Sequence, residues 1–297
     1  MNRQQKIIAI VGPTSSGKSD LAVQLAKQIG GEVISADSRQ VYRGLDIGSG
    51  KVTKKEMAGI RHHLLDVARP SAVFTADDFK RQAKKAIEDI SKRGKIPIIA
   101  GGTGFWFETL LATESLPPVP PDKKLRVQLA KQETMELFAE LKKLDPIRAK
   151  AIDCHNRPRL IRAIEICRQL GTVPRKKTNR RQYDVLWLGL LVPKEILAQK
   201  IKDRLKRRLA RGLIAEVRRL QAQGVSWRRL YDLGLEYRYV SLHLRGQLSK
   251  EKMTVTLEQA IIKYAKRQMT WFKREKQINW LNQFKQADLL VTDWLND

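Results

Sequence analysis

Cysteine is nearly absent from this chain, because only Cys154 and Cys167 occur among its 297 residues. Two cysteines exclude a disulfide framework and a four-cysteine zinc site, and we interpret both as thiols of a reducing compartment. Residues 1–6 are polar, unlike the start of a signal peptide. No apolar run approaches the ~20 residues that a membrane helix needs. The sequence therefore predicts a cytoplasmic protein that does not enter the membrane.

Acidic residues are also scarce relative to basic ones. Lys and Arg number 58 against 31 Asp and Glu, which gives a formal net charge of +27. Such a charge causes self-repulsion in the compact state, and a polyanionic partner relieves it. Nucleic acid is the first candidate partner, and an anionic membrane surface is the second. The hydrophobic fraction of 42% is typical of a globular chain, and the length favours about two domains.

Short apolar runs alternate with amphipathic stretches in the first 112 residues. Glycines follow two of the runs, and Thr75 with Asp78 fits the capping box that begins a helix. The expected strands lie at 7–11, 32–36 and 96–100, and the expected helices at 20–29, 75–93 and 105–112. This alternation predicts an α/β fold with a parallel sheet flanked by helices.

A proline-rich stretch at 116–121 interrupts this pattern. The following residues, up to 183, are typical of basic helices, and the apolar run at 184–192 predicts a return to the sheet. Helices are expected next at 193–211, 213–223, 236–245 and 249–277. We therefore predict a P-loop core of residues 1–114 and 184–297, with a helical C-terminal part. Residues 115–183 are expected to form an inserted all-helical subdomain, and its basic stretch 175–181 favours contact with an RNA backbone.

Residues 12–19 fit the phosphate-loop pattern G-x-x-x-x-G-K-[ST] of nucleotide-binding proteins. Backbone N–H groups of such a loop surround an anion, and the N-terminus of the next helix adds a positive field. Lys18 supplies a charge to the phosphate oxygens, and the Ser19 hydroxyl is placed to bind Mg²⁺. The predicted diphosphate-binding residues are Gly12, Pro13, Thr14, Ser15, Ser16, Gly17, Lys18 and Ser19.

The strand at 96–100 lacks the terminal Asp that completes the metal site of many P-loop enzymes, because Gly-Gly-Thr-Gly follows it. The nearest acid at a strand end is Asp37. Since parallel strands end at one edge of the sheet, we expect Asp37 beside the phosphate loop. There it either binds metal or accepts a proton from a nucleophile, and the alternative that it only caps a turn stays open.

Further short motifs extend the comparison over most of the chain. In order, they are 12–19, 35–42, 46–51, 62–66, 101–104, 159–165, 234–238 and 267–272. This series resembles the tRNA dimethylallyltransferase family, also called tRNA isopentenyltransferases or IPP transferases. The resemblance implies transfer of a dimethylallyl group from dimethylallyl diphosphate to the exocyclic amine of an adenosine. That adenosine lies 3′ to the anticodon, in tRNAs that read codons beginning with U.

The resemblance also implies partners and residue roles. The partners are dimethylallyl diphosphate and the anticodon stem-loop of tRNA, the cofactor is Mg²⁺, and we expect a monomer. Asp37 matches the general base or orienting group for the adenine amine, and Thr103 and Arg204 match positions that stabilise the diphosphate or the transition state. The residues expected to contact tRNA are Asp37, Ser38, Arg39, Gln40, Thr103, Arg126, Arg159 and Arg162.

The chemistry agrees with these residue types. An allylic diphosphate ionises through a loose transition state, so positive charge must meet the departing group. The adenine amine must lose a proton as the new bond forms, and a carboxylate can accept it. The adenine must also leave its stack, so we expect base flipping. The phosphate loop then holds a leaving group instead of ATP, in agreement with the missing acid.

The sequence departs from the family pattern in places. Val52 stands where the family often has proline, which predicts a looser loop at 47–52, and Asp153 stands where it often has histidine. The Cys and His set of the eukaryotic zinc finger is missing, so we expect a bacterial or organellar type. We also expect structural hydrogen bonds from His62 and His63, while Trp106 and Phe107 fit the prenyl pocket and the core equally well.

Three other functions are compatible with parts of the sequence. A P-loop kinase for small molecules predicts ATP hydrolysis but does not need a charge of +27. An adenylate isopentenyltransferase would prenylate a free nucleotide, and it has little use for a basic insert. An RNA-binding module with an inactive P-loop does not need Lys18, Asp37, Thr103 and Arg204 together.

Overall fold

The computed structural model describes residues 4–111, 117–174 and 182–297. Residue contacts divide the chain into two compact units, one of residues 1–111 and 181–297 and the other of residues 112–180. This division lies a few residues from the predicted limits of the insert at 115 and 183. The basic stretch 175–181 lies outside the described residues, so its contact with RNA stays a prediction.

Across the described residues, the first unit contains a six-stranded sheet whose neighbouring strands all run parallel. In sheet order the strands are β3 (His62–His63), β2 (Glu32–Ser35), β4 (Pro97–Ala100), β1 (Gln5–Val11), β5 (Tyr183–Leu190) and β6 (Asn279–Leu281). Every residue from 7 to 11 of β1 is fully buried, as expected for a central parallel strand covered on both faces. The predicted α/β fold is confirmed.

The order of the strands places a crevice at the carboxyl ends of β1 and β4. Along the strand order, the chain leaves β1 in the direction of β2. It later leaves β4 in the opposite direction, towards β5. Connections that diverge in this way open a space above the strand ends, where α/β proteins bind ligands. The residues that follow β1, β2 and β4 therefore meet at one edge of the sheet.

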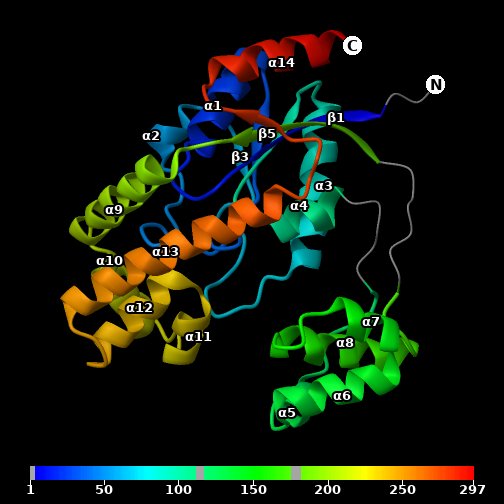
Figure 1. The fold of residues 1–297 in the computed structure, drawn as a ribbon. Helices are drawn as coiled ribbons and strands as arrows, with labels where there is room; N and C mark the ends of the chain where they lie inside the picture. Colours follow the sequence, from blue (N-terminus) through cyan, green and yellow to red (C-terminus); the bar gives the residue numbers. More distant parts are fainter. Residues whose placement is uncertain (1–3, 112–116, 175–181) are drawn as a thin grey trace. The chain divides into compact units, whose positions relative to one another are not determined.

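Side chains of β1 alternate between two apolar cores. Ile8 and Ile10 pack with α1 (Lys18–Ile29) and α14 (Lys285–Asn296), which Figure 1 shows on one side of the sheet. Ile7 and Val11 belong to the core of the other side, which Figure 1 shows covered by α3, α4 and α13. The helices of that core are α3 (Ala76–Lys92), α4 (Gly104–Leu111), α9 (Lys194–Ala210), α10 (Leu213–Ala222), α11 (Trp227–Asp232), α12 (Leu235–Leu244) and α13 (Lys250–Phe272).

Sequence analysis missed several short elements. The segment at 37–70, predicted as a loop, contains α2 (Lys54–Met57) and β3, which are too short to give a periodic pattern. The helix predicted to reach residue 277 ends at Phe272, because the chain then turns to add β6 beside β5. The capping box of Thr75 and Asp78 is confirmed at the start of α3.

The second unit consists of α5 (Lys123–Leu129), α6 (Thr134–Leu144), α7 (Pro146–Ala151) and α8 (Arg157–Leu170), which share an apolar core. Glu165 is fully buried beneath α5, where Arg126 and the backbone N–H of Asp122 donate to it. Arg162 also pairs with this carboxylate. Burial alone would raise the pKa of Glu165, but these donors lower it to about 2. Within the described ranges, no helix of either unit is long and apolar enough to cross a membrane.

Candidate functional site

The phosphate loop joins β1 to α1 at the centre of the sheet edge. Gly12 has a φ of +149° and Gly17 a φ of +95°, which residues with a side chain rarely adopt. A Cβ on Gly12 would lie 3.1 Å from Ser16 Oγ and 3.3 Å from the Leu190 carbonyl oxygen. The loop therefore folds tightly around a hollow, and the free N–H groups at the start of α1 face an anion-binding position.

Lys18 lies half-buried at the base of the loop, where its ammonium donates to the Pro13 carbonyl oxygen at 2.6 Å. Burial first and the positive charge of Arg204 second lower the pKa of Lys18 to about 7, against the opposing effect of Asp37. Within the described residues, the ammonium is bonded to this neutral carbonyl oxygen and not to a close anionic partner. A diphosphate in the loop would supply one.

Two hydroxyl groups test whether the loop fits a diphosphate with Mg²⁺. Ser16 Oγ is buried and makes no hydrogen bond within the described chain, as expected of a donor that awaits an anion. Ser19 lines the cavity together with the carboxylates of Asp20 and Glu56. No group of three His, Cys, Asp or Glu side chains suited to a metal occurs in the described ranges. Hydroxyl, carboxylate and phosphate oxygens nevertheless form the donor set that Mg²⁺ accepts, with water completing it.

Asp37 follows β2 in a turn that is held from two sides. The Arg39 backbone N–H donates to Asp37 Oδ1 at 2.9 Å, so the carboxylate does cap its own turn. Thr103 Oγ1 accepts from the Ser38 backbone N–H at 3.1 Å. A Cβ on Gly101 would lie 2.2 Å from the Ala36 carbonyl oxygen, so only glycine permits this approach of the two strand ends. Within the part of the chain that the structure describes, the turn engages Asp37 through Oδ1 alone, and the side chain also lines the cavity.

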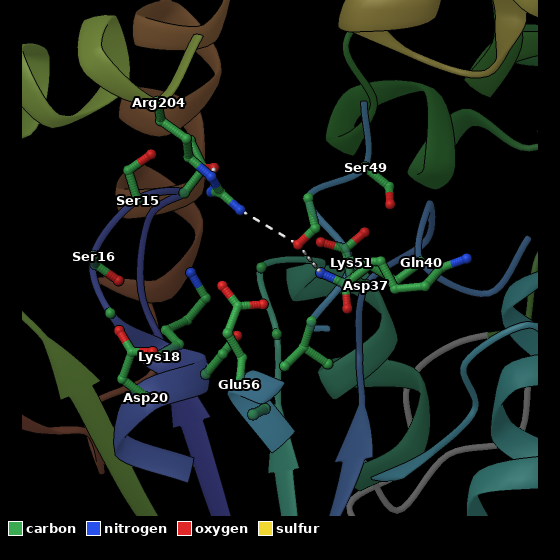
Figure 2. Close-up of a pocket in the computed structure, with 18 of the residues that line it drawn as sticks. Ser15, Ser16, Lys18, Asp20, Asp37, Gln40, Ser49, Lys51, Glu56 and Arg204 are labelled. Carbon is green, nitrogen blue, oxygen red and sulfur yellow. Dashed lines mark hydrogen bonds between the residues drawn. The ribbon is translucent and has the colours of Figure 1, made fainter. Parts of the chain in front are cut away.

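Arg204 reaches the phosphate loop from α9. Its guanidinium donates to Thr14 Oγ1 at 3.3 Å and to the Gly50 carbonyl oxygen at 3.4 Å, which Figure 2 shows as a dashed line. Burial first and the neighbouring charge of Arg208 second lower the pKa of Arg204 to about 10. Both hydrogen bonds are long, so the guanidinium keeps capacity for a stronger acceptor. Arg204 therefore points inward from α9 towards the phosphate loop.

These groups line a cavity of about 650 Å³. Figure 2 shows Lys18, Glu56, Asp37 and Arg204 directed into a shared space. Its basic residues are Lys18, Lys51, Lys200, Arg204, Arg207, Arg208 and Arg211, and its acidic residues are Asp20, Asp37 and Glu56. The excess of positive charge favours a multiply charged anion, and the volume exceeds what a small diphosphate ester alone would fill.

Some of the predicted site residues line this cavity, and others lie elsewhere in the structure. Residues 14–19, Asp37, Gln40 and Arg204 line the cavity, whereas Thr103 is absent from its lining and instead supports the turn of Asp37. Arg126 and Arg162 pair with Glu165 inside the second unit, and Arg159 is exposed there. Contact of these three arginines with tRNA stays a prediction.

Sequence analysis missed the contribution of α13 to the site. Gln268 Oε1 accepts from the Thr14 backbone N–H at 2.9 Å, and its Nε2 donates to the Gly102 carbonyl oxygen at 2.8 Å. Tyr264, one helical turn earlier, also lines the cavity. The i, i+4 spacing places both side chains on one face of the helix, but the sequence alone assigned Gln268 no role beyond its place in the motif at 267–272.

The structure also shows the contacts of the two histidines and two aromatic residues that the sequence analysis considered. His62 Nδ1 lies 2.9 Å from the Ile60 carbonyl oxygen, and His63 Nε2 lies 2.7 Å from Glu32 Oε2, so the expected structural hydrogen bonds are confirmed. Trp106 stacks on Phe79 with ring centroids 4.2 Å apart, and Phe107 is buried in the same core. The core therefore holds both aromatic residues, and neither lines the cavity.

Comparisons with known proteins agree with this geometry. The family model described as "IPP transferase" matches residues 40–275. A tRNA dimethylallyltransferase of Thermomicrobium roseum is 42% identical over 94% of this chain and 87% of its own length. A second relative of that name, from Treponema denticola, is 41% identical over 92% of this chain and 95% of its own.

Solved structures give the same result. A tRNA isopentenylpyrophosphate transferase of Staphylococcus epidermidis superposes with a TM-score of 0.73 at 36% identity, covering 99% of each chain. A eukaryotic dimethylallyltransferase acting on tRNA gives a TM-score of 0.82 at 28% identity, covering 98% of this chain and 77% of its own.

Proposed function

The chain belongs to the IPP transferase family, and on that premise we propose that it transfers a dimethylallyl group from its diphosphate to tRNA. The acceptor is the exocyclic amine of the adenosine 3′ to the anticodon, in tRNAs that read codons beginning with U. The observation that carries this proposal is the cavity where the phosphate loop, Asp37 and Arg204 meet. The cavity combines an anion-binding loop with a carboxylate, and it has room for an adenine ring.

The diphosphate lies in the phosphate loop under this proposal. The N–H groups of α1, the Ser16 hydroxyl and the Lys18 ammonium surround its oxygens, and the Arg204 guanidinium approaches from the opposite side. As the carbon–oxygen bond of the allylic ester breaks, negative charge develops on the diphosphate. Fixed positive charges at the site stabilise that charge in the transition state.

Asp37 receives the proton of the adenine amine. The amine nitrogen bonds to the allylic carbon while the diphosphate departs with the electron pair of the broken bond, and the nitrogen then carries an extra proton. The turn fixes Asp37 through Oδ1, which leaves its other oxygen to accept that proton. Thr103 stabilises the same turn and so positions the Asp37 carboxylate.

Mg²⁺ is a further part of the proposal. Bound to the diphosphate, it would neutralise charge on the leaving group. The Ser19 hydroxyl and the carboxylates of Asp20 and Glu56 are the residues that would hold it.

Binding of tRNA is supported by charge. The net charge of +27 provides the electrostatic attraction that RNA binding requires. We assign the adenosine and its neighbours to Asp37, Ser38, Arg39 and Gln40, and backbone contacts to Arg126, Arg159 and Arg162. We also propose that the protein acts as a monomer.

A transfer assay tests this function. Protein, Mg²⁺ and radiolabelled dimethylallyl diphosphate are incubated with unmodified tRNA and, separately, with AMP. We expect label in tRNA alone. Label in AMP would indicate prenylation of a free nucleotide, and ATP turnover without transfer of label would indicate a kinase. Binding to tRNA should also fall steeply with salt concentration, whereas a flat salt dependence would contradict the role of the basic residues.

A further inference from the structure

A buried carboxylate organises the loop at residues 46–49. Glu216, on the first turn of α10, is 2% exposed. It accepts from the backbone N–H groups of Asp46 at 3.0 Å, Ile47 at 2.7 Å and Gly48 at 2.9 Å. Three successive N–H groups directed at one carboxylate form an anion-binding nest that is already filled from within the chain. This arrangement holds the loop in place although Val52 replaces a proline, so the expectation of a looser loop does not apply to residues 46–49.

Tyr237 of α12 extends this contact by one residue. Its hydroxyl donates to Glu216 Oε1 at 2.9 Å and accepts from the Ser49 backbone N–H at 3.1 Å. Burial, followed by the negative charge of Glu216, raises the pKa of the Tyr237 phenol, so it stays a neutral donor. A Cβ on Gly48 would lie 2.6 Å from Tyr237 Cζ, so the ring packs directly on the loop backbone. The tyrosine and glutamate thus fix residues 46 to 49 as one unit.

The fixed loop leads directly to the cavity. The next residue, Gly50, presents its carbonyl oxygen to Arg204 Nη2 at 3.4 Å and to Gln40 Nε2 at 3.3 Å. A Cβ on Gly50 would lie 2.2 Å from Arg204 Nη2, which shows how closely the guanidinium approaches this backbone. Gln40 and Arg204 both line the cavity. The Gly50 carbonyl is therefore a direct link between the buried pair and two predicted site residues.

We propose that Glu216 and Tyr237 are positioning residues for the diphosphate site, acting through the Gly50 carbonyl on Arg204 and Gln40. The inference rests on the proposed function, because it assigns Arg204 to the diphosphate. Neither side chain lines the cavity itself. Their effect on ligand binding must therefore pass through the loop, and loss of the Tyr237 hydroxyl should release Ser49 and let Gly50 move away from Arg204.

A double-mutant cycle tests the proposal with inorganic diphosphate as the probe. The dissociation constant is measured by calorimetry for the wild type, Tyr237→Phe, Arg204→Ala and the double variant. Loss of a buried hydrogen bond predicts about fivefold to tenfold weaker binding for Tyr237→Phe. In the Arg204→Ala background the same change should alter binding by less than about twofold, because the group being positioned is gone. An equal effect in both backgrounds, or none in the wild type, would overturn the proposal.

Matched measurements separate positioning from general destabilisation. Tyr239→Phe removes a hydroxyl from the same helix, away from residues 46–49, and should bind diphosphate as the wild type does. If Tyr237→Phe does not fold, as judged by thermal melting, Glu216→Gln takes its place in the cycle. If the wild type binds diphosphate but does not prenylate tRNA, the proposed function is wrong. The double-mutant cycle then still tests whether Tyr237 positions Arg204 for diphosphate binding. A wild type that does not bind diphosphate would contradict both.

Discussion

Replacement of Lys18 by glutamine should remove a specific pH dependence from diphosphate binding. In the ligand-free protein the pKa of Lys18 is lowered to about 7, by burial first and by Arg204 second. A bound diphosphate places negative charge beside the ammonium and raises that pKa again. Binding is therefore coupled to uptake of a proton, and affinity falls as the pH rises above about 7.

The size of this effect follows from the pKa. With a pKa of about 7, roughly nine-tenths of Lys18 is charged at about pH 6, and only about 3% is charged at about pH 8.5. If the bound diphosphate keeps the lysine charged over this range, affinity falls by about thirtyfold from Lys18 alone, which equals about 2 kcal/mol. Uptake of nearly one proton should accompany binding at the upper end of the range.

Calorimetric titration with inorganic diphosphate measures both quantities. Dissociation constants are determined from about pH 6 to about pH 8.5 for the wild type and for Lys18→Gln, in buffers of different ionisation enthalpy. Titration of the ligand itself is common to both proteins and cancels in the comparison. The same slope of affinity against pH in the two proteins, with equal proton uptake, would refute the assignment of Lys18 to the diphosphate.

Three further predictions concern other parts of the molecule. Asp37→Asn should slow prenyl transfer about 10²–10⁴-fold in single-turnover experiments and weaken the binding of tRNA far less, and equal losses in both would contradict its role as a base. Gln268→Leu leaves the Thr14 N–H and the Gly102 carbonyl unpaired, so unfolding free energy should fall by about 1–3 kcal/mol and diphosphate should bind more weakly. Glu165, with a pKa of about 2, should stabilise the protein above about pH 4.5 and lose this effect as the pH falls towards 2. Thermal melting of Glu165→Gln should therefore differ from the wild type at neutral pH and converge with it in acid, and a constant difference would refute the ion pairing.

The sequence was most informative where one pattern served both fold and chemistry. The buried run of β1 followed by Gly12 and Lys18 predicts a strand, a tight turn and an anion site together, and the structure has that strand and turn. Asp37 could be placed near the loop because parallel strands end at one edge. These conclusions need only local pattern and sheet topology.

The rest depends on contacts between distant segments. Gln268 binds Thr14 across more than 250 residues, and Glu216 binds Asp46 across 170, so neither pairing leaves a local signature. For Thr103, a match to a motif predicts direct contact with the reaction, which stays a prediction, and the structure adds a hydrogen bond from the Ser38 backbone N–H that the motif does not indicate. Tertiary hydrogen bonds decide which polar residues line a cavity and which support it.

The most direct test of the central claim is product analysis after a single incubation. The protein, Mg²⁺ and radiolabelled dimethylallyl diphosphate are supplied with two tRNAs that differ only at the base 3′ to the anticodon, adenosine in one and guanosine in the other. The account predicts label in the adenosine tRNA alone, with release of an equal amount of diphosphate and loss of both in Lys18→Gln. Label in the guanosine tRNA, or diphosphate released without transfer to either RNA, would contradict it.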